Sequence, residues 1–158
     1  MKRGFTLVEL LVVTVIIGIL FTIGLSAYSS ARDRQTGVAL GEQITSILRS
    51  AQQSTNIGNK TCPGKFIGTK VSFKTQASQI VKINVDSICS DGITTLENTV
   101  KLANITVSSD YVITFNALRG IDLGVVGTEL PITYTSNGLT YEVLVTNTGT
   151  IENKGVLP

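Results

Sequence analysis

The chain has 158 residues, of which 42% are hydrophobic and 15% charged, so it is too apolar for a disordered protein and suits one modest domain with an extra segment. Its formal charge of +2 comes from Lys2 and Arg3, because without them eleven of the thirteen basic residues remain against eleven acidic ones. This balance argues against a nucleic-acid partner, which needs a basic face, and the absence of histidine excludes imidazole chemistry.

An apolar run without a charged side chain extends from residue 10 to residue 31. It is long enough to cross a bilayer as a helix, which takes about 20 apolar residues. Because Lys2 and Arg3 precede it, we expect the N-terminus in the cytoplasm and the C-terminal part outside. Glu9 is the only charge between Arg3 and Arg32. A charge inside an apolar helix costs about 3 kcal/mol on insertion scales, so such a residue usually has a partner.

Two simpler interpretations of this segment stay open. A secretory signal peptide would need a small-x-small cleavage site, to which Ser26-Ala27 and Ser29-Ser30-Ala31 come nearest. A permanent single-pass anchor would need no processing, and Glu9 would then snorkel toward the headgroups.

Beyond the apolar run, small and apolar residues recur every three to four positions between Ala27 and Ala51, with charged residues between them. This spacing predicts an amphipathic continuation of the same helix over 32–57, with an apolar stripe that packs on a domain. Gly58 predicts the end of the helix. Gly18 and Gly24 are the points where the helix could melt.

The region 58–158 reads as a β-rich head with short strands separated by turns. Asn137-Gly138 lies between two alternating runs and predicts a hairpin with a type I′ turn. We expect Tyr141, Val143 and Val145 to share one face of the second strand. The fold class is therefore α+β, a long N-terminal helix packed on an antiparallel β-sheet. The expected strands cover 71–73, 80–85, 100–102, 105–107, 111–115, 132–135 and 140–145.

The two cysteines, Cys62 and Cys89, predict one disulfide bond in an oxidising compartment, and two buried thiols are the alternative. A two-cysteine metal site lacks further soft ligands. Aspartates near predicted turns lack EF-hand spacing, and serines have no histidine base or nucleophile elbow. We therefore expect no catalytic residue, no metal site and no cofactor. The aspartates near predicted turns are Asp86, Asp91, Asp110 and Asp122.

The N-terminus reads Lys2-Arg3-Gly4-Phe5-Thr6-Leu7-Val8-Glu9, which resembles the processing site of the type IV pilin and pseudopilin family. The resemblance implies that a prepilin peptidase removes the basic leader 1–4 by cutting between Gly4 and Phe5, and that the amine of Phe5 is then methylated. Residues 5–31 would be a transmembrane and filament-core helix. The carboxylate of Glu9 would neutralise the amine of Phe5 on a neighbouring subunit and set axial register during assembly.

The resemblance also implies a non-enzymatic structural subunit of a type IV pilus or a type II secretion pseudopilus. Its partners would be the peptidase and other pilin or pseudopilin subunits, in a homo- or heteropolymer. Before assembly it would sit in the inner membrane with its C-terminal domain outside, and afterwards in a filament in the periplasm or outside the cell.

The second half is similar to the closing part of the H-type minor pseudopilins and the FimT-like minor pilins. The residues concerned are Phe115-Asn116-Ala117-Leu118-Arg119-Gly120, Ile132-Thr133-Tyr134 and the stretch from Tyr141 to Ile151, while 48–52 resembles the end of their first helix.

Two other functions stay open. The β-rich head of a minor pilin could bind DNA or a secreted protein, and the feature to test is a basic cluster at Lys60, Lys65, Lys70 and Lys74. A permanently anchored envelope protein would instead keep an unprocessed N-terminus and form no filament.

Overall fold

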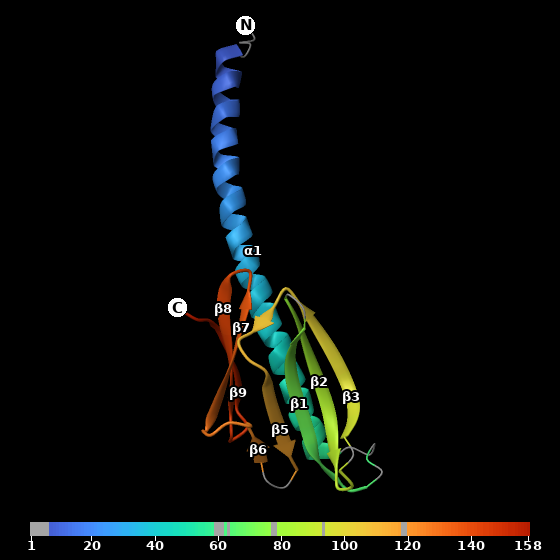
Figure 1. Cartoon of the computed structure of the whole chain (residues 1–158). Helices are drawn as coiled ribbons and strands as arrows, with labels where there is room; N and C mark the ends of the chain where they lie inside the picture. The colour runs from blue at the N-terminus through green and yellow to red at the C-terminus, as the bar shows by residue number, and fades with distance from the viewer. Residues whose placement is uncertain (1–6, 59–61, 63, 77–78, 93, 118–119) are drawn as a thin grey trace. The chain divides into compact units, whose positions relative to one another are not determined.

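The computed structural model describes residues 7–58, 62, 64–76, 79–92, 94–117 and 120–158. The chain forms two compact units, Met1–Gln35 and Thr36–Pro158, and the single helix α1 (Leu7–Ile57) contributes to both. Figure 1 shows helix α1 and labels the strands of the second unit.

Helix α1 extends over 51 residues, and the chain has no proline before Pro63 that could interrupt it. It ends at Ile57, where Gly58 takes a positive φ of 78° and its amide donates to the carbonyl of Ser54 at 3.1 Å. A glycine adopts this left-handed conformation without steric cost, which is the usual way a helix is closed. The helix therefore stops where Gly58 predicts.

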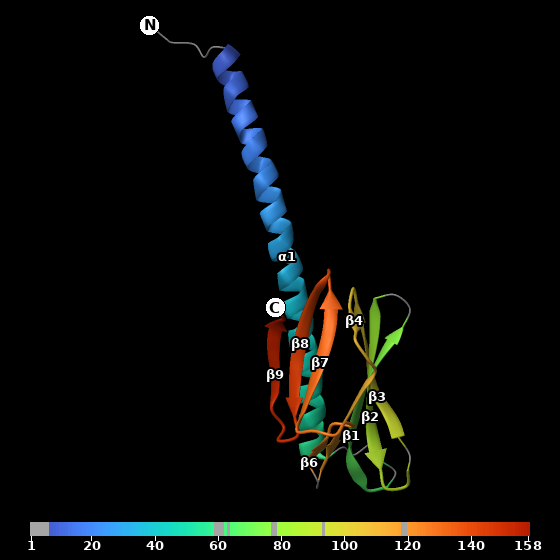
Figure 2. The ribbon, with the colours of Figure 1, turned by 60° about the vertical axis from the view of Figure 1, so that its left-hand side comes forward.

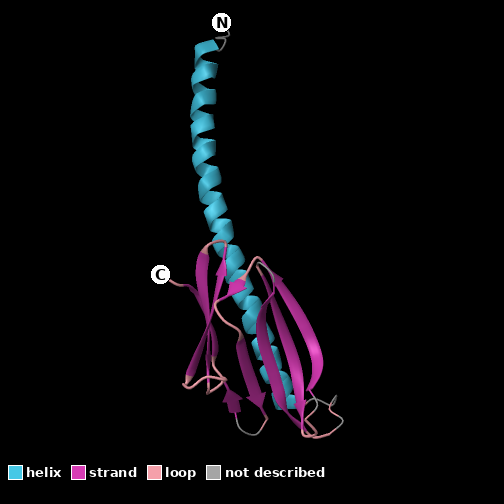
Figure 3. Cartoon of the chain, in the orientation of Figure 1, coloured by secondary structure: helices cyan, strands magenta, loops and turns pink. Residues whose placement is uncertain are grey.

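The second unit contains two antiparallel sheets rather than the one sheet predicted from the sequence (Figure 3). The α+β fold class itself is confirmed, with antiparallel pairing throughout. Sheet A consists, in spatial order, of β3 (Thr94–Ala103), β2 (Ile80–Cys89), β1 (Phe66–Gln76), β5 (Tyr111–Asn116) and β6 (Gly120–Asp122). Sheet B consists of β4 (Thr106–Val107), β7 (Glu129–Ser136), β8 (Leu139–Thr146) and β9 (Ile151–Val156).

Both sheets contribute one face to a common core with the C-terminal part of α1 (Figure 2). Buried and partly exposed residues alternate along β2, β5, β7 and β8, as expected for strands with one solvated face. The apolar stripe of the helix supplies Leu40, Ile44, Leu48 and Ala51 to this core. The amphipathic pattern predicted between 32 and 57 thus faces the sheets from Leu40 onward.

Helix α1 and sheet B approach each other closely at two helical glycines, Gly37 and Gly41. A Cβ atom at Gly37 would overlap the ring of Tyr141, and one at Gly41 would overlap the hydroxyl of Tyr134. The two tyrosine rings stack with centroids 5.3 Å apart, and the hydroxyl of Tyr134 donates to the carbonyl of Gly37 at 3.0 Å. Glycine costs about 1 kcal/mol relative to alanine inside a helix, and here it makes room for the two rings.

A cluster of hydroxyl groups joins the two sheets. The hydroxyl of Tyr111, the first residue of β5, lies 2.6 Å from Ser108 Oγ and accepts a hydrogen bond from the backbone amide of Thr133 in β7 at 3.3 Å. Burial raises the pKa of Tyr111, but hydrogen bonds with Ser108, Ser109 and Thr133 lower it by more, so the net shift is downward. The cluster therefore ties sheet A to sheet B through polar contacts at the edge of the core.

The β7–β8 hairpin confirms the turn predicted at Asn137-Gly138. Ser136 pairs with Leu139, and Asn137 and Gly138 take φ values of 50° and 77°. Both signs match a type I′ turn, which needs positive φ at its two central residues. The predicted face is also confirmed, because Tyr141, Val143 and Val145 are fully buried.

Cys62 and Cys89 form a disulfide bond, as their number predicts, with Cα atoms 5.7 Å apart. Two hydrogen bonds join the chain next to this disulfide. The amide of Ser90 donates to the carbonyl of Lys65 at 2.8 Å, and the amide of Lys65 donates to Ser90 Oγ at 3.0 Å. The segment before β1 is therefore fastened to the end of β2.

Candidate functional site

The first candidate site is the N-terminal part of α1, where apolar side chains are exposed on all sides of the helix. Large apolar residues between Leu7 and Phe21 keep 46% to 82% of their surface accessible. A helix that is apolar all round is normally covered by lipid or by other protein. The residues are Leu7, Val8, Leu10, Leu11, Val12, Val13, Val15, Ile16, Ile17, Ile19, Leu20 and Phe21.

The two threonines in this stretch hydrogen-bond to the backbone of the helix. Thr14 Oγ1 donates to the carbonyl of Leu11 at 2.8 Å, and Thr22 Oγ1 donates to that of Gly18 at 2.9 Å. Their hydroxyl groups therefore do not need water, and this suits a helix whose surroundings are apolar. The helix is also continuous through Gly18 and Gly24, the two predicted weak points.

Glu9 lies in the first turn of α1, where the partial positive charge of the helix N-terminus stabilises a carboxylate. It is the only acidic residue before Asp33 in the sequence. The other predicted processing residues, Gly4 and Phe5, lie outside the described residues. The predicted anchor, 5–31, is likewise described only in part: residues 5 and 6 and the side chains of 23–27 are excluded.

Among the described residues, no helix is both long enough and apolar enough to cross a membrane.

The second candidate site is the basic cluster predicted at Lys60, Lys65, Lys70 and Lys74. Lys60 lies outside the described residues. Lys65 precedes β1 and Lys74 lies near its end, so the two are about 30 Å apart along an extended strand. Lys70 is half-buried and pairs in register with Asp86. The three described lysines are therefore spread along β1 and the residue before it rather than gathered.

The register of the strands places Lys74 in a different group. It is directly opposite Lys82 of β2, and Lys82 is directly opposite Lys101 of β3. Sequence reasoning missed this row because the three residues lie on separate strands, and the register between strands cannot be read from spacing along the chain.

The described residues hold no arrangement that points to catalysis. No group of three or more His, Cys, Asp or Glu side chains among them could hold a metal ion. A hollow of about 390 Å³ lies beside the helix and is lined by Ser46, Ile47, Ser50, Ala51, Ser54, Val85 and Asn98. Asp122, one of the turn aspartates, accepts a hydrogen bond from the amide of Gly124 at 3.0 Å, which is a local turn contact.

Two segments named in the finer sequence resemblance meet in the structure. Arg49 Nη2 donates to the carbonyl of Ile151 at 3.1 Å, and Gln52 Nε2 donates to that of Gly149 at 3.2 Å. The helix residues of 48–52 thus hold the β8–β9 turn against α1. This turn takes a positive φ of 97° at Gly149.

Residues 1–25 match the family model described as the prokaryotic N-terminal methylation motif. Comparisons of the chain with curated proteins and with solved structures gave no match. The chain therefore carries a prepilin-type cleavage and methylation motif. Its α+β architecture, a long N-terminal helix with antiparallel sheets packed on its C-terminal part, is consistent with the type IV pilin fold.

Proposed function

We propose that this chain is a structural subunit of a type IV pilus or a type II secretion pseudopilus, processed by a prepilin peptidase and assembled through its N-terminal helix. The observation that supports this most is the coincidence of the matched motif with the apolar surface of α1. The motif covers 1–25, and within it the helix exposes large apolar side chains on every side and a single carboxylate.

The proposal divides the chain into four parts with separate tasks. The leader 1–4 directs processing, and 5–31 holds the precursor in the inner membrane and later lies in the filament core. Residues 32–57 carry the β-rich head, 58–158, which faces outward from the filament. The exposed apolar side chains need such cover in both states, first by lipid tails and then by the helices of other subunits.

Glu9 has a specific part in this scheme. After cleavage, Phe5 would carry a methylated ammonium group, and its charge would face the same apolar surroundings as the carboxylate of Glu9. Each charge is costly there alone, and pairing between neighbouring subunits removes much of that cost only at one axial position. The pair would therefore set the register between subunits.

We further assign the chain to the minor subunits of the H-type or FimT-like kind. This assignment rests on the sequence resemblance, which includes residues 48–52 and the stretch from Tyr141 to Ile151; the hydrogen bonds of Arg49 and Gln52 hold these two segments together.

The deciding experiment measures the intact mass and the N-terminal sequence of the protein purified from its own cells. We expect a chain that begins at methylated Phe5. A matched variant, Glu9→Gln, should be processed in the same way but should fail to enter filaments, because it keeps the size of the side chain and removes its charge. A native chain that still begins at Met1 would overturn the proposal and leave a permanently anchored envelope protein.

A further inference from the structure

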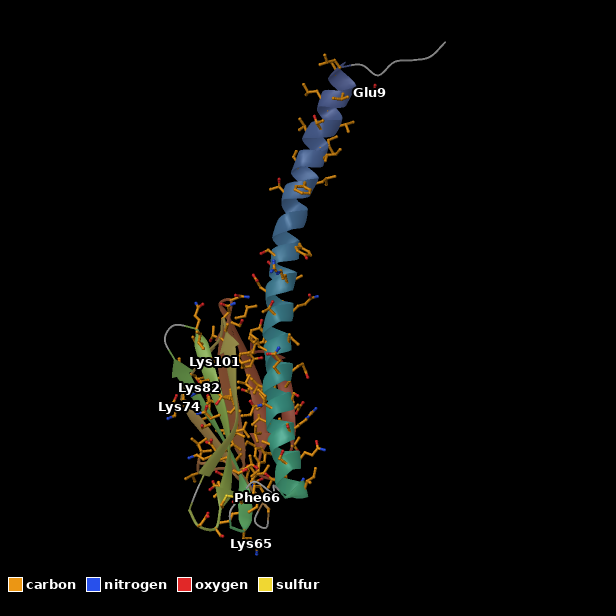
Figure 4. All side chains as sticks on the ribbon, turned by 90° about the vertical axis from the view of Figure 1, so that its right-hand side faces the viewer. Glu9, Lys65, Phe66, Lys74, Lys82 and Lys101 are labelled. Carbon is orange, nitrogen blue, oxygen red and sulfur yellow. A yellow bond between two sulfur atoms is a disulfide. The ribbon has the colours of Figure 1, made fainter. Side chains whose placement is uncertain are left out.

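The outer face of sheet A carries three lysines in one row across three neighbouring strands. Lys74 of β1 is directly opposite Lys82 of β2, which is directly opposite Lys101 of β3. Figure 4 shows the three side chains next to one another on the side of the sheet away from α1. Lys74 and Lys101 are exposed and Lys82 is half-buried. We call these three residues the basic row.

The basic row has a cost that no contact among the described residues offsets. Neighbouring strands lie about 4.8 Å apart, so three positive charges start from backbone positions within about 10 Å, and like charges directly opposite destabilise a sheet. Within the part of the chain that the structure describes, none of the three ammonium groups has a hydrogen-bond or ion-pair partner. The carboxylate of Asp86 on the same strand face is about 13 Å from Lys82 along β2, beyond the screening length of physiological salt.

The outer face of sheet B carries the opposite charge. Glu129 of β7, Glu142 of β8 and Glu152 of β9 alternate with buried residues of their strands, and we call them the acidic face. Lys154 lies among them and binds Glu152 at 2.7 Å. The hydrogen bond to Glu152 raises the pKa of Lys154, and the charges of Glu152, Glu142 and Glu129 raise it further. The acidic face therefore keeps a net negative charge after this pairing.

The two faces belong to one compact unit, and the chain without Lys2 and Arg3 has equal numbers of basic and acidic residues. A neutral protein with separated charges has little long-range attraction for a polyanion, which needs a net basic field. Its basic row and acidic face are instead complementary to each other. Because the two surfaces differ, contact between them is heterologous and extends from copy to copy, into a ring if the rotation closes and into an open filament if it does not.

We propose that the basic row of one copy docks on the acidic face of a second copy of this chain. The inference rests on the proposed function. It adds a contact between the β-rich heads of neighbouring subunits to the polymer that the N-terminal helices are proposed to form. It assigns Lys82 and Lys101 on one side, and Glu142 and Glu152 on the other, to the selection of the neighbouring subunit.

The test measures self-association of the full-length chain in detergent by sedimentation velocity, in about 20 mM and about 500 mM salt. We expect the wild-type chain to associate more weakly in high salt. The basic-row variant Lys82→Glu/Lys101→Glu and the acidic-face variant Glu142→Lys/Glu152→Lys should each associate at least tenfold more weakly in low salt. Lys101→Glu alone should weaken association more than its matched control Lys65→Glu, which makes the same charge change outside the basic row.

Restoration makes the test specific. An equimolar mixture of the two double variants should associate like the wild type, because each copy with two acidic surfaces then alternates with a copy that has two basic ones. The fourfold variant should also recover, since it exchanges the signs of the two faces. Circular dichroism and the midpoint of thermal unfolding check that each variant is folded, and recovery in the mixture separates lost contact from misfolding.

Three results would overturn the inference: a wild-type chain that stays monomeric in low salt, equal association of Lys101→Glu and Lys65→Glu, or a mixture that does not recover. Unchanged self-association together with loss of binding to a single-stranded DNA oligonucleotide in the basic-row variant would assign the row to a polyanion. The N-terminus of the native chain is read separately. A methylated Phe5 with charge-independent association removes only this inference, whereas Met1 with charge-dependent association removes only the proposed function.

Discussion

The contact between Gly37 and Tyr141 gives the sharpest test of how the second unit is held together. Gly37→Ala adds one methyl group to α1. In an open helix this change stabilises by about 1 kcal/mol, because alanine is the better helix former. At Gly37, however, the new Cβ would overlap three atoms of the Tyr141 side chain, Cζ, Cε2 and the hydroxyl oxygen.

The expected result follows from the balance of these two effects. Overpacking a filled core costs about 1 to 3 kcal/mol, and more where a rigid ring must move. Tyr141 is fully buried and stacked on Tyr134, so its ring has little room to retreat. We therefore expect Gly37→Ala to lower the free energy of unfolding by about 1 to 2 kcal/mol despite the better helix propensity. In a unit of this size that lowers the unfolding midpoint by about 3 to 8 °C.

Urea unfolding of the full-length chain in detergent measures the change, followed by near-ultraviolet circular dichroism because the chain has four tyrosines and no tryptophan. The control repeats Gly37→Ala in a Tyr141→Leu background, where the smaller side chain leaves space and the alanine should become neutral or stabilising. The difference between the two backgrounds isolates the contact. A Gly37→Ala chain more stable than the wild type would refute the close approach of helix and sheet.

Three further predictions concern the second unit. Cys62→Ser/Cys89→Ser should lower the free energy of unfolding by about 3 to 4 kcal/mol, because the loop between the cysteines is no longer closed; equal urea midpoints with and without reductant would contradict this. Burial, and then the charges of Tyr141 and Glu42, raise the pKa of Tyr134 above its ordinary 10.0, so the unfolded chain loses this proton first as the pH rises. The free energy of unfolding should therefore fall by up to about 1.4 kcal/mol per pH unit above pH 10, and this part of the slope should vanish in Tyr134→Phe when both are titrated in parallel. Gly138→Val should destabilise the β7–β8 hairpin by about 1 kcal/mol or more, because a β-branched residue resists the positive φ of 77°, whereas the exposed Thr135→Val on the same hairpin should change the urea midpoint little.

The sequence predicted those parts of the fold whose signals are local. The end of α1 depends on Gly58, and the β7–β8 hairpin depends on Asn137-Gly138, so both can be read from a few neighbouring residues. The prediction missed β9, because Glu152, Asn153, Lys154 and Gly155 have low strand propensity and the segment is held by pairing with β8. The division into two sheets was also missed, because it depends on which strands pair, and pairing between strands cannot be read from the sequence of each strand.

The candidate sites also differ in whether their signal is local in the sequence. The motif around Glu9 is contiguous, and the sequence comparison recovered it over 1–25. The basic row depends on the register of three strands, and the acidic face depends on three others, so neither could be predicted from spacing. The role predicted for Glu9 stays a prediction, because the residues it would follow, Gly4 and Phe5, lie outside the described part of the chain.

The contacts between α1 and the last strands have a consequence for when the second unit can fold. Arg49 reaches the carbonyl of Ile151 across 102 residues of sequence, and Asn153 Nδ2 donates to Glu42 Oε1 across 111. These contacts close only when the C-terminal residues are present, and such distant contacts make folding slow. In the proposed topology, with the N-terminus in the cytoplasm and the head outside, the C-terminal strands would cross the membrane last, so the core could not be completed during transit. The helix would then acquire the sheets that cover its apolar stripe only after the C-terminal residues had been exported.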